Sequence, residues 1–236
     1  MTMLTTVQYF MRRTGLPRPS TVIGTTDEMV LQILGLLEEE GNDLAARGSW
    51  EALTVEATHT SLAQEDQGAM ATLASRGFRY IKNDSIWDRT DKLPILGPLN
   101  DREWQAVKGF GVSGPRYRYR IRNGKLLINP TPTAGHTWAF EYASQHWILG
   151  ADGTTYKQYF TLDTDTILLP ETLVLMGLRW RYKKEKGLDY AEDFRTYEMQ
   201  VKDALGRDGG KKTISMDQES HRPAPGVFIP EGSWNL

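Results

Sequence analysis

A short stretch near the middle of the chain, residues 117–129, constrains the fold more than any other part of the sequence. Aromatic or aliphatic side chains alternate with basic ones in its first half: Tyr117, Tyr119 and Ile121 against Arg118, Arg120 and Arg122. Successive side chains of a strand point to opposite faces, so the arginines should lie on one face and the tyrosines on the other. Asn123-Gly124 follows, and both residues tolerate positive φ. This pair predicts a type I′ turn and an antiparallel hairpin that returns through residues 125–129.

Further β-structure is expected on both sides of this hairpin. Alternation around residues 53–60 predicts one strand. Another should run over residues 137–143, with Trp138, Phe140 and Tyr142 on one face. Asn100 can cap a short helical insert that Glu103 completes as a capping box. We therefore expect an antiparallel meander with one aromatic face and one polar face.

Helical periodicity marks both ends of the chain. Apolar residues at helical spacing predict a short helix over residues 4–11 and a longer one from about Asp27, which Gly41-Asn42 could interrupt. A second pair is expected after Pro170, which suits the first position of a helix. Gly187 should end the first of these helices, and the second should run from about Asp189 to Leu205. Two amphipathic helices joined by a short turn pack antiparallel.

Together these patterns predict an α+β fold. A helical bundle, made of the N-terminal helices and the C-terminal helical hairpin, would pack with a small antiparallel β-domain and carry an extended C-terminal arm. The expected parts are an N-terminal helical part (1–50), a β-rich domain with a short helical insert (51–168), the helical hairpin (169–210) and the arm (211–236). The arm is rich in proline and polar residues, so it could be disordered. It also carries Phe228, Ile229 and Trp234, which favour an arm that becomes ordered on a partner.

Composition excludes several kinds of chemistry. The chain has no cysteine, which rules out disulfides and thiolate metal sites. Its formal net charge is −2, so nothing in the overall charge attracts it to nucleic acid or to a membrane surface. We find no apolar run long enough to cross a bilayer and no targeting segment, and expect synthesis in the cytoplasm.

The local matches to catalytic or ligand-binding motifs fail on context. Gly109, Gly111 and Gly114 form G-x-G-x-x-G, but a helix precedes them and a strand follows, the reverse of a dinucleotide site. Asp163 and Asp165 form a D-x-D pair without further ligands at calcium-binding spacing. The histidines lack metal-binding spacing; they are His59, His136, His146 and His221. We expect no catalytic residue, no metal and no cofactor.

The basic side chains of the hairpin, Arg118, Arg120 and Arg122, are candidate contact residues. Because alternation separates them from the tyrosines, the strand lacks the combined stacking and charge that single-stranded nucleic acid needs. A solvated face, or a subunit contact to carboxylates, is the better interpretation.

One longer pattern does resemble a known family. Residues 86–99 read IWDRTDKLPILGPL, and Glu103-Trp104-Gln105 follow. The order continues with Tyr119-Arg120-Ile121-Arg122, Leu126-Leu127-Ile128, Pro130, Gly135, Phe140-Glu141-Tyr142 and Trp147. This order, over roughly residues 54–206, resembles the head-to-tail adaptor (connector) proteins of tailed bacteriophages, particularly short-tailed ones. The matched residues are of packing and turn types.

The resemblance implies a structural virion protein and no enzyme. Such adaptors form a homo-oligomeric ring, usually a dodecamer, beneath the portal protein at the virion neck. They join the portal to the tail nozzle or tail tube protein, and double-stranded DNA passes through the lumen without specific binding. Their C-terminal arm commonly docks on the portal, a use that Phe228, Ile229 and Trp234 would fit. The candidate interface residues are therefore these three and the three arginines.

Two other functions stay open on sequence alone. A carbohydrate-binding module of a tail or baseplate could use the aromatic face that includes Trp138. A cell-wall hydrolase could use Asp163, Asp165 or Glu141 as its acids.

Overall fold

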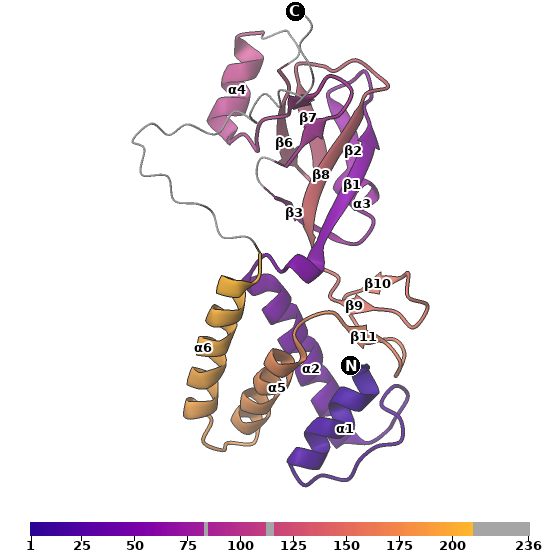
Figure 1. Ribbon diagram of the computed structural model, residues 1–236, viewed down its shortest axis with the longest axis vertical. Helices are drawn as coiled ribbons and strands as arrows, with labels where there is room; N and C mark the ends of the chain where they lie inside the picture. Colours follow the sequence, from indigo (N-terminus) through magenta and orange to yellow (C-terminus); the bar gives the residue numbers. More distant parts are fainter. Residues whose placement is uncertain (83–84, 112–115, 210–236) are drawn as a thin grey trace, which may run out of the picture.

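The computed structural model describes residues 1–82, 85–111 and 116–209. These residues form two lobes that stack along the long axis of the molecule (Figure 1). The helical lobe comprises residues 1–50 and 145–209, and the sheet lobe comprises residues 51–144. Each lobe has its own cluster of buried apolar side chains.

Four helices build the helical lobe: α1 (Met3–Arg13), α2 (Glu28–Arg47), α5 (Glu171–Glu185) and α6 (Ala191–Arg207). Helix α5 packs against both α2 and α6. Asp27 caps α2, since its carboxylate accepts a hydrogen bond from the Met29 amide at 2.9 Å. Pro170 immediately precedes α5. No helix in the described part of the chain is long and apolar enough to cross a membrane.

Helix α2 continues without a break through Gly41-Asn42. The glycine is required by packing, because a Cβ atom there would lie 2.1 Å from the indole ring of Trp147. Asn42 accepts a hydrogen bond from the Nε1 of the same indole at 3.0 Å. Gly41 and Asn42, which have low helix propensity, therefore form the contact surface for the fully buried side chain of Trp147, which follows the sheet lobe in the sequence.

The largest sheet lies in the sheet lobe and is built around β8 (Thr137–Ser144). Strand β1 (Thr54–Thr60) pairs with one edge of β8, and β3 (Phe78–Ile81) and β4 (Trp87–Asp88) pair with it as well. Strand β5 (Leu93–Pro94) extends the sheet beyond β4. A short 3₁₀ helix, Glu51–Leu53, joins α2 to β1.

A second sheet in this lobe has the order β2–β7–β6, with strands Asp66–Ala69, Lys125–Asn129 and Arg118–Arg122. Two helices accompany it, α3 (Met70–Leu73) and α4 (Asp101–Gly109). The third sheet, β10–β9–β11, lies beside the helices in Figure 1. Its strands are short: Tyr156–Lys157, Ile148–Leu149 and Thr166–Ile167.

The predicted hairpin and the predicted helical insert are confirmed. Strands β6 and β7 are antiparallel, with Arg122 opposite Lys125. Asn123 and Gly124 between them have φ values of 51° and 68°, as a type I′ turn requires. Asn100 and Glu103 form the expected capping box at the start of α4.

The fold class predicted from the sequence is wrong. The described residues contain six α-helices and eleven strands in three antiparallel sheets, so the molecule is sheet-rich and is not dominated by a helical bundle with a small β-domain. The meander is wrong too, because β8 does not follow β7 in one sheet but pairs with β1, 77 to 89 residues earlier in the chain. Local alternation identifies a strand but carries no information on which distant strand it meets.

Candidate functional site

The arginine strand β6 lies at the edge of the second sheet, and its two faces differ as predicted. Tyr119 is buried, whereas Arg118 and Arg122 are exposed. Arg120 is half-buried and forms an ion pair with Asp101, the first residue of α4. One of the three candidate contact arginines is thus already engaged within the chain, and the other two face solvent.

The other predicted contact residues, Phe228, Ile229 and Trp234, lie outside the described residues, as do His221 and Gly114. Gly109 is the last residue of α4, and Gly111 sits in a turn with φ of 56°. A helix therefore precedes the glycine motif, as the sequence indicated, and α4 does not direct its N-terminus at the glycines.

The two aspartates of the D-x-D pair hold loops in place. Asp163 accepts hydrogen bonds from the Val22 and Ile23 amides at 3.1 and 2.8 Å. Asp165 is buried and accepts from the Thr161 amide at 2.9 Å and from the Lys157 ammonium at 2.9 Å. Burial raises the pKa of Asp165, but these donors outweigh it and leave the pKa below its ordinary value. Neither carboxylate is placed as a catalytic acid.

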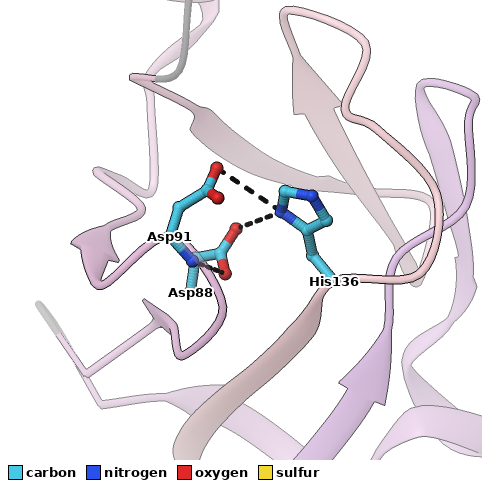
Figure 2. A group of neighbouring side chains, drawn as sticks. All are labelled: Asp88, Asp91 and His136. Carbon is cyan, nitrogen blue, oxygen red and sulfur yellow. Dashed lines mark hydrogen bonds and ion pairs between the residues drawn. The ribbon is translucent and has the colours of Figure 1, made fainter.

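A cluster that the sequence did not reveal lies at the edge of the largest sheet. Asp88 in β4, Asp91 in the turn after it and His136 just before β8 converge on one point (Figure 2). The Nδ1 of His136 lies 3.0 Å from Asp88 Oδ2 and 3.5 Å from Asp91 Oδ2. The other ring nitrogen points away from the two carboxylates (Figure 2).

Asp88 is the centre of this cluster and is completely buried. Its Oδ1 accepts hydrogen bonds from the amides of Thr90 and Asp91 at 2.8 and 3.0 Å. Its Oδ2 accepts from the Trp138 indole at 3.0 Å, in addition to His136. Burial raises the pKa of Asp88, but the four donors together outweigh burial and hold the pKa below its ordinary value.

The ligand atoms of this cluster lie within 4.8 Å of one another, close enough for one cation. However, both oxygens of Asp88 already accept two hydrogen bonds each, so a metal would displace donors that the fold itself supplies. The adjacent Ser61 hydroxyl is also engaged, donating to the Thr133 carbonyl and accepting from the His136 amide. We interpret the cluster as a structural link between β4 and β8.

A second buried polar group joins the helices. Glu40 of α2 is completely buried and accepts hydrogen bonds from Arg181 Nε at 2.7 Å and from the Tyr197 hydroxyl. Arg181 also contacts Glu39 and Asp43. Burial raises the pKa of Glu40 to about 7, although Arg181 and Tyr197 act in the opposite direction. Gly177 leaves room for the carboxylate, since a Cβ atom there would lie 2.0 Å from it.

Neither cluster could be predicted from local patterns, because Asp88 and His136 are 48 residues apart in the chain and Glu40 and Arg181 are 141 residues apart. Asp88 itself lies within the W-D-R-T string, residues 87–90, that resembles the adaptor family. No protein-family model matches the chain, and no curated protein sequence matches it.

Proposed function

We propose that this chain is a structural head-to-tail adaptor of a tailed bacteriophage, which forms a ring between the portal and the tail. The observation that carries the proposal is the ordered string of residues that resembles that family. Most of those residues have structural roles in the sheet lobe, and Trp147 packs in the core of the helical lobe. Trp87-Asp88 forms β4, Leu93-Pro94 forms β5, and Trp104 is fully buried on α4. Tyr119 and Tyr142 are buried in the same lobe.

The distribution of exposed apolar side chains supports a role in assembly. Leu188, Tyr190 and Phe194 are exposed around the turn between α5 and α6, and the rings of Tyr190 and Phe194 contact Trp180. Phe110, at the end of α4 in the other lobe, is 85% exposed. Exposed apolar groups at opposite ends of a molecule suit the two different faces that each subunit of a closed ring must present.

The aromatic residues that a carbohydrate-binding module would use are buried in this structure. Trp138, Phe140 and Tyr142 are each no more than 2% exposed. A glycan platform requires ring faces that a sugar can reach, and these faces pack into the core of the sheet lobe. The hydrolase alternative also loses support, since Asp163 and Asp165 are engaged in holding loops.

Electron microscopy of virions whose genome encodes this chain tests the proposal directly. We expect density for the chain at the neck, in a ring between the portal and the tail. Native mass spectrometry of the purified chain with its portal protein should show a complex containing multiple copies of both. Density located only in the capsid shell, the tail fibres or the baseplate would contradict the proposal.

A further inference from the structure

Two adjoining hollows lie along α1 in the helical lobe. The larger has a volume of about 420 Å³ and is lined by the end of α1, by α5 and by the turn after α5. The smaller, of about 180 Å³, is lined by α1 and by Arg18 in the segment that follows it. Tyr9 lines both hollows. Helix α1 and the turn between α5 and α6 lie at the end of the helical lobe farthest from the sheet lobe (Figure 1).

The two hollows are positively charged. Basic side chains line both of them: Arg13, Arg179 and Lys183 in the larger, Arg12 and Arg18 in the smaller. No aspartate or glutamate of the described residues lines either one. Asp193 of α6 pairs with Arg179 at 3.3 Å and with Lys183, so it neutralises part of this charge. The three arginines of α1 and the segment after it form no ion pair within the described residues. This surface therefore attracts anionic groups, although the net charge of the whole chain is −2.

The larger hollow also has an apolar wall. The rings of Phe10 and Tyr182 meet edge to face, with their centroids 5.4 Å apart, and Leu175 lines the same hollow. Leu188, at the turn after α5, lines it as well and is 55% exposed. A large apolar side chain from a partner would bury these groups and gain affinity, while opposite charges around it would fix its register.

The tyrosines of the two hollows are poorly placed for stacking on nucleic-acid bases. The Arg12 guanidinium lies 5.6 Å from the centroid of the Tyr9 ring, and the Lys186 ammonium lies 5.5 Å from that of Tyr182. Single-stranded nucleic acid binds through bases stacked on open aromatic faces, and these faces are partly covered within the chain. A polypeptide needs only a hollow for a side chain and charges that match its own.

We propose that this face of the helical lobe binds an acidic segment of another protein. A large apolar side chain of the segment fills the hollow lined by Phe10, Tyr182 and Leu188, and its carboxylates pair with the arginines of both hollows. Because these arginines are exposed, the affinity should fall as the salt concentration rises. This inference does not depend on the adaptor role.

Selection from a random peptide library tests the chemistry of the proposed partner. The library is displayed on yeast cells and sorted against the purified full-length chain. We expect the selected peptides to combine several aspartates or glutamates with at least one tryptophan, phenylalanine or leucine. Selected peptides that are neutral or basic, or failure to select any peptide, would overturn the proposal.

Binding of one selected peptide to variants of the chain then locates the site, with fluorescence anisotropy as the measurement. We expect Arg13→Glu and Leu188→Ala each to weaken binding about 3- to 10-fold, through lost charge pairing and lost apolar contact respectively. Arg122→Glu makes the same charge change on an exposed residue of β6 in the sheet lobe, and it should leave the affinity unchanged. Thermal melting checks that each variant remains folded.

Three results of these measurements would contradict the proposal. Equal weakening by Arg122→Glu would show that the peptide responds only to the overall charge of the chain. A single-stranded oligonucleotide that displaces the peptide, and whose own binding Arg13→Glu abolishes, would assign the face to nucleic acid. A dimer of the native chain in sedimentation experiments that Arg13→Glu dissociates would assign it to a second copy of the chain.

Discussion

Single residues in this protein are fixed by contacts with distant parts of the chain. Gly41 illustrates this, because it sits in the middle of α2, where glycine has low helix propensity. Glycine is needed at this position because the Trp147 indole occupies the space that a side chain of residue 41 would fill. Glu40, the preceding residue, is a buried carboxylate that faces Arg181 from α5 and Tyr197 from α6.

Substitution at Gly41 should therefore be costly in spite of a gain in helix propensity. We expect Gly41→Ala to lower the free energy of unfolding by about 1–3 kcal/mol, because the methyl group would overlap the indole. Gly35→Ala in the same helix is the control. Nothing lies within 4 Å of its added Cβ, so it should be neutral or stabilising by up to about 1 kcal/mol. Urea denaturation of both variants measures the difference, and equal effects would contradict the packing argument.

Glu40 should make stability depend on pH near neutrality. Burial raises the pKa of Glu40 in the folded chain to about 7, above the ordinary value of 4.5, so the folded state binds the proton more tightly than the unfolded state does. The stabilisation that proton binding by Glu40 gives to the folded state is therefore greatest below pH 4.5 and is lost as pH rises through 7. The loss in the free energy of unfolding is at most about 3 kcal/mol.

Glu40→Gln removes this titration. From pH 5 to pH 7, we expect the unfolding free energy of the native chain to fall relative to that of the variant. Above pH 7 the difference between the two should become constant. Denaturation at a series of pH values measures the difference. Glu185→Gln removes an exposed negative charge from α5 and serves as the control. A constant difference between Glu40→Gln and the native chain over this range would show that Glu40 is ionised throughout.

At the scale of elements, short strands are held by side chains as much as by backbone pairing. Strand β4 contains only two residues, yet Asp88 bonds the turn that follows it and two side chains at the start of β8. The same holds for β11, which also has two residues: Asp165, directly before it, accepts hydrogen bonds from the amides of Thr161 and Leu162 in the preceding loop. A two-residue strand has too few ladder hydrogen bonds to define its own position, so these buried carboxylates define it.

Acid should weaken the link between β4 and β8. The pKa of Asp88 is lowered in the folded chain, so its contribution is present above the ordinary aspartate pKa and is lost as pH falls through the lower, folded-state value. We expect Asp88→Asn to destabilise the chain at pH 7 by about 1–3 kcal/mol. The loss should shrink below pH 4, where the native carboxyl also becomes protonated. Denaturation curves at pH 7 and pH 3 provide the comparison.

A cation at the same cluster should have no stabilising effect. Asp88 already accepts four hydrogen bonds, and ligand binding raises stability only when it is specific to the folded state. We expect the midpoint of thermal unfolding to be unchanged by millimolar Mg²⁺, Ca²⁺ or Zn²⁺. A rise in the midpoint that His136→Ala removes would instead identify a metal site.

At the scale of the whole molecule, the two lobes touch through a few specific contacts. Arg79 of β3 donates to the carbonyls of Ala45 and Ala46 near the end of α2. Gly77 lies against the His146 ring, where a Cβ atom would come within 2.5 Å. The chain crosses between the lobes both after α2 and after β8 (Figure 1). These connections give one elongated unit with distinct surfaces at its two ends, a shape that suits the proposed ring.

Removal of residues 217–236 separates the contribution of the arm to the fold from its contribution to assembly. We expect the shortened chain to unfold cooperatively at an unchanged temperature, since the described residues, all before Gly210, already form both buried apolar clusters. Its binding to the portal protein should weaken, because the apolar residues Phe228, Ile229 and Trp234 are lost. Calorimetry measures the first effect and co-sedimentation with portal rings the second. Loss of cooperative unfolding would make the tail part of a core.

The local elements of this protein can be predicted from its amino-acid sequence. The hairpin at Asn123-Gly124, the capping box at Asn100 and the helices at both ends follow from turn chemistry and periodicity, which act over a few neighbouring residues. The fold establishes which strands pair, that Trp138 faces a core, and that Asp88 contacts His136 and Glu40 contacts Arg181. Pairing and burial depend on groups brought together from distant parts of the chain, and a local pattern does not specify its distant partner.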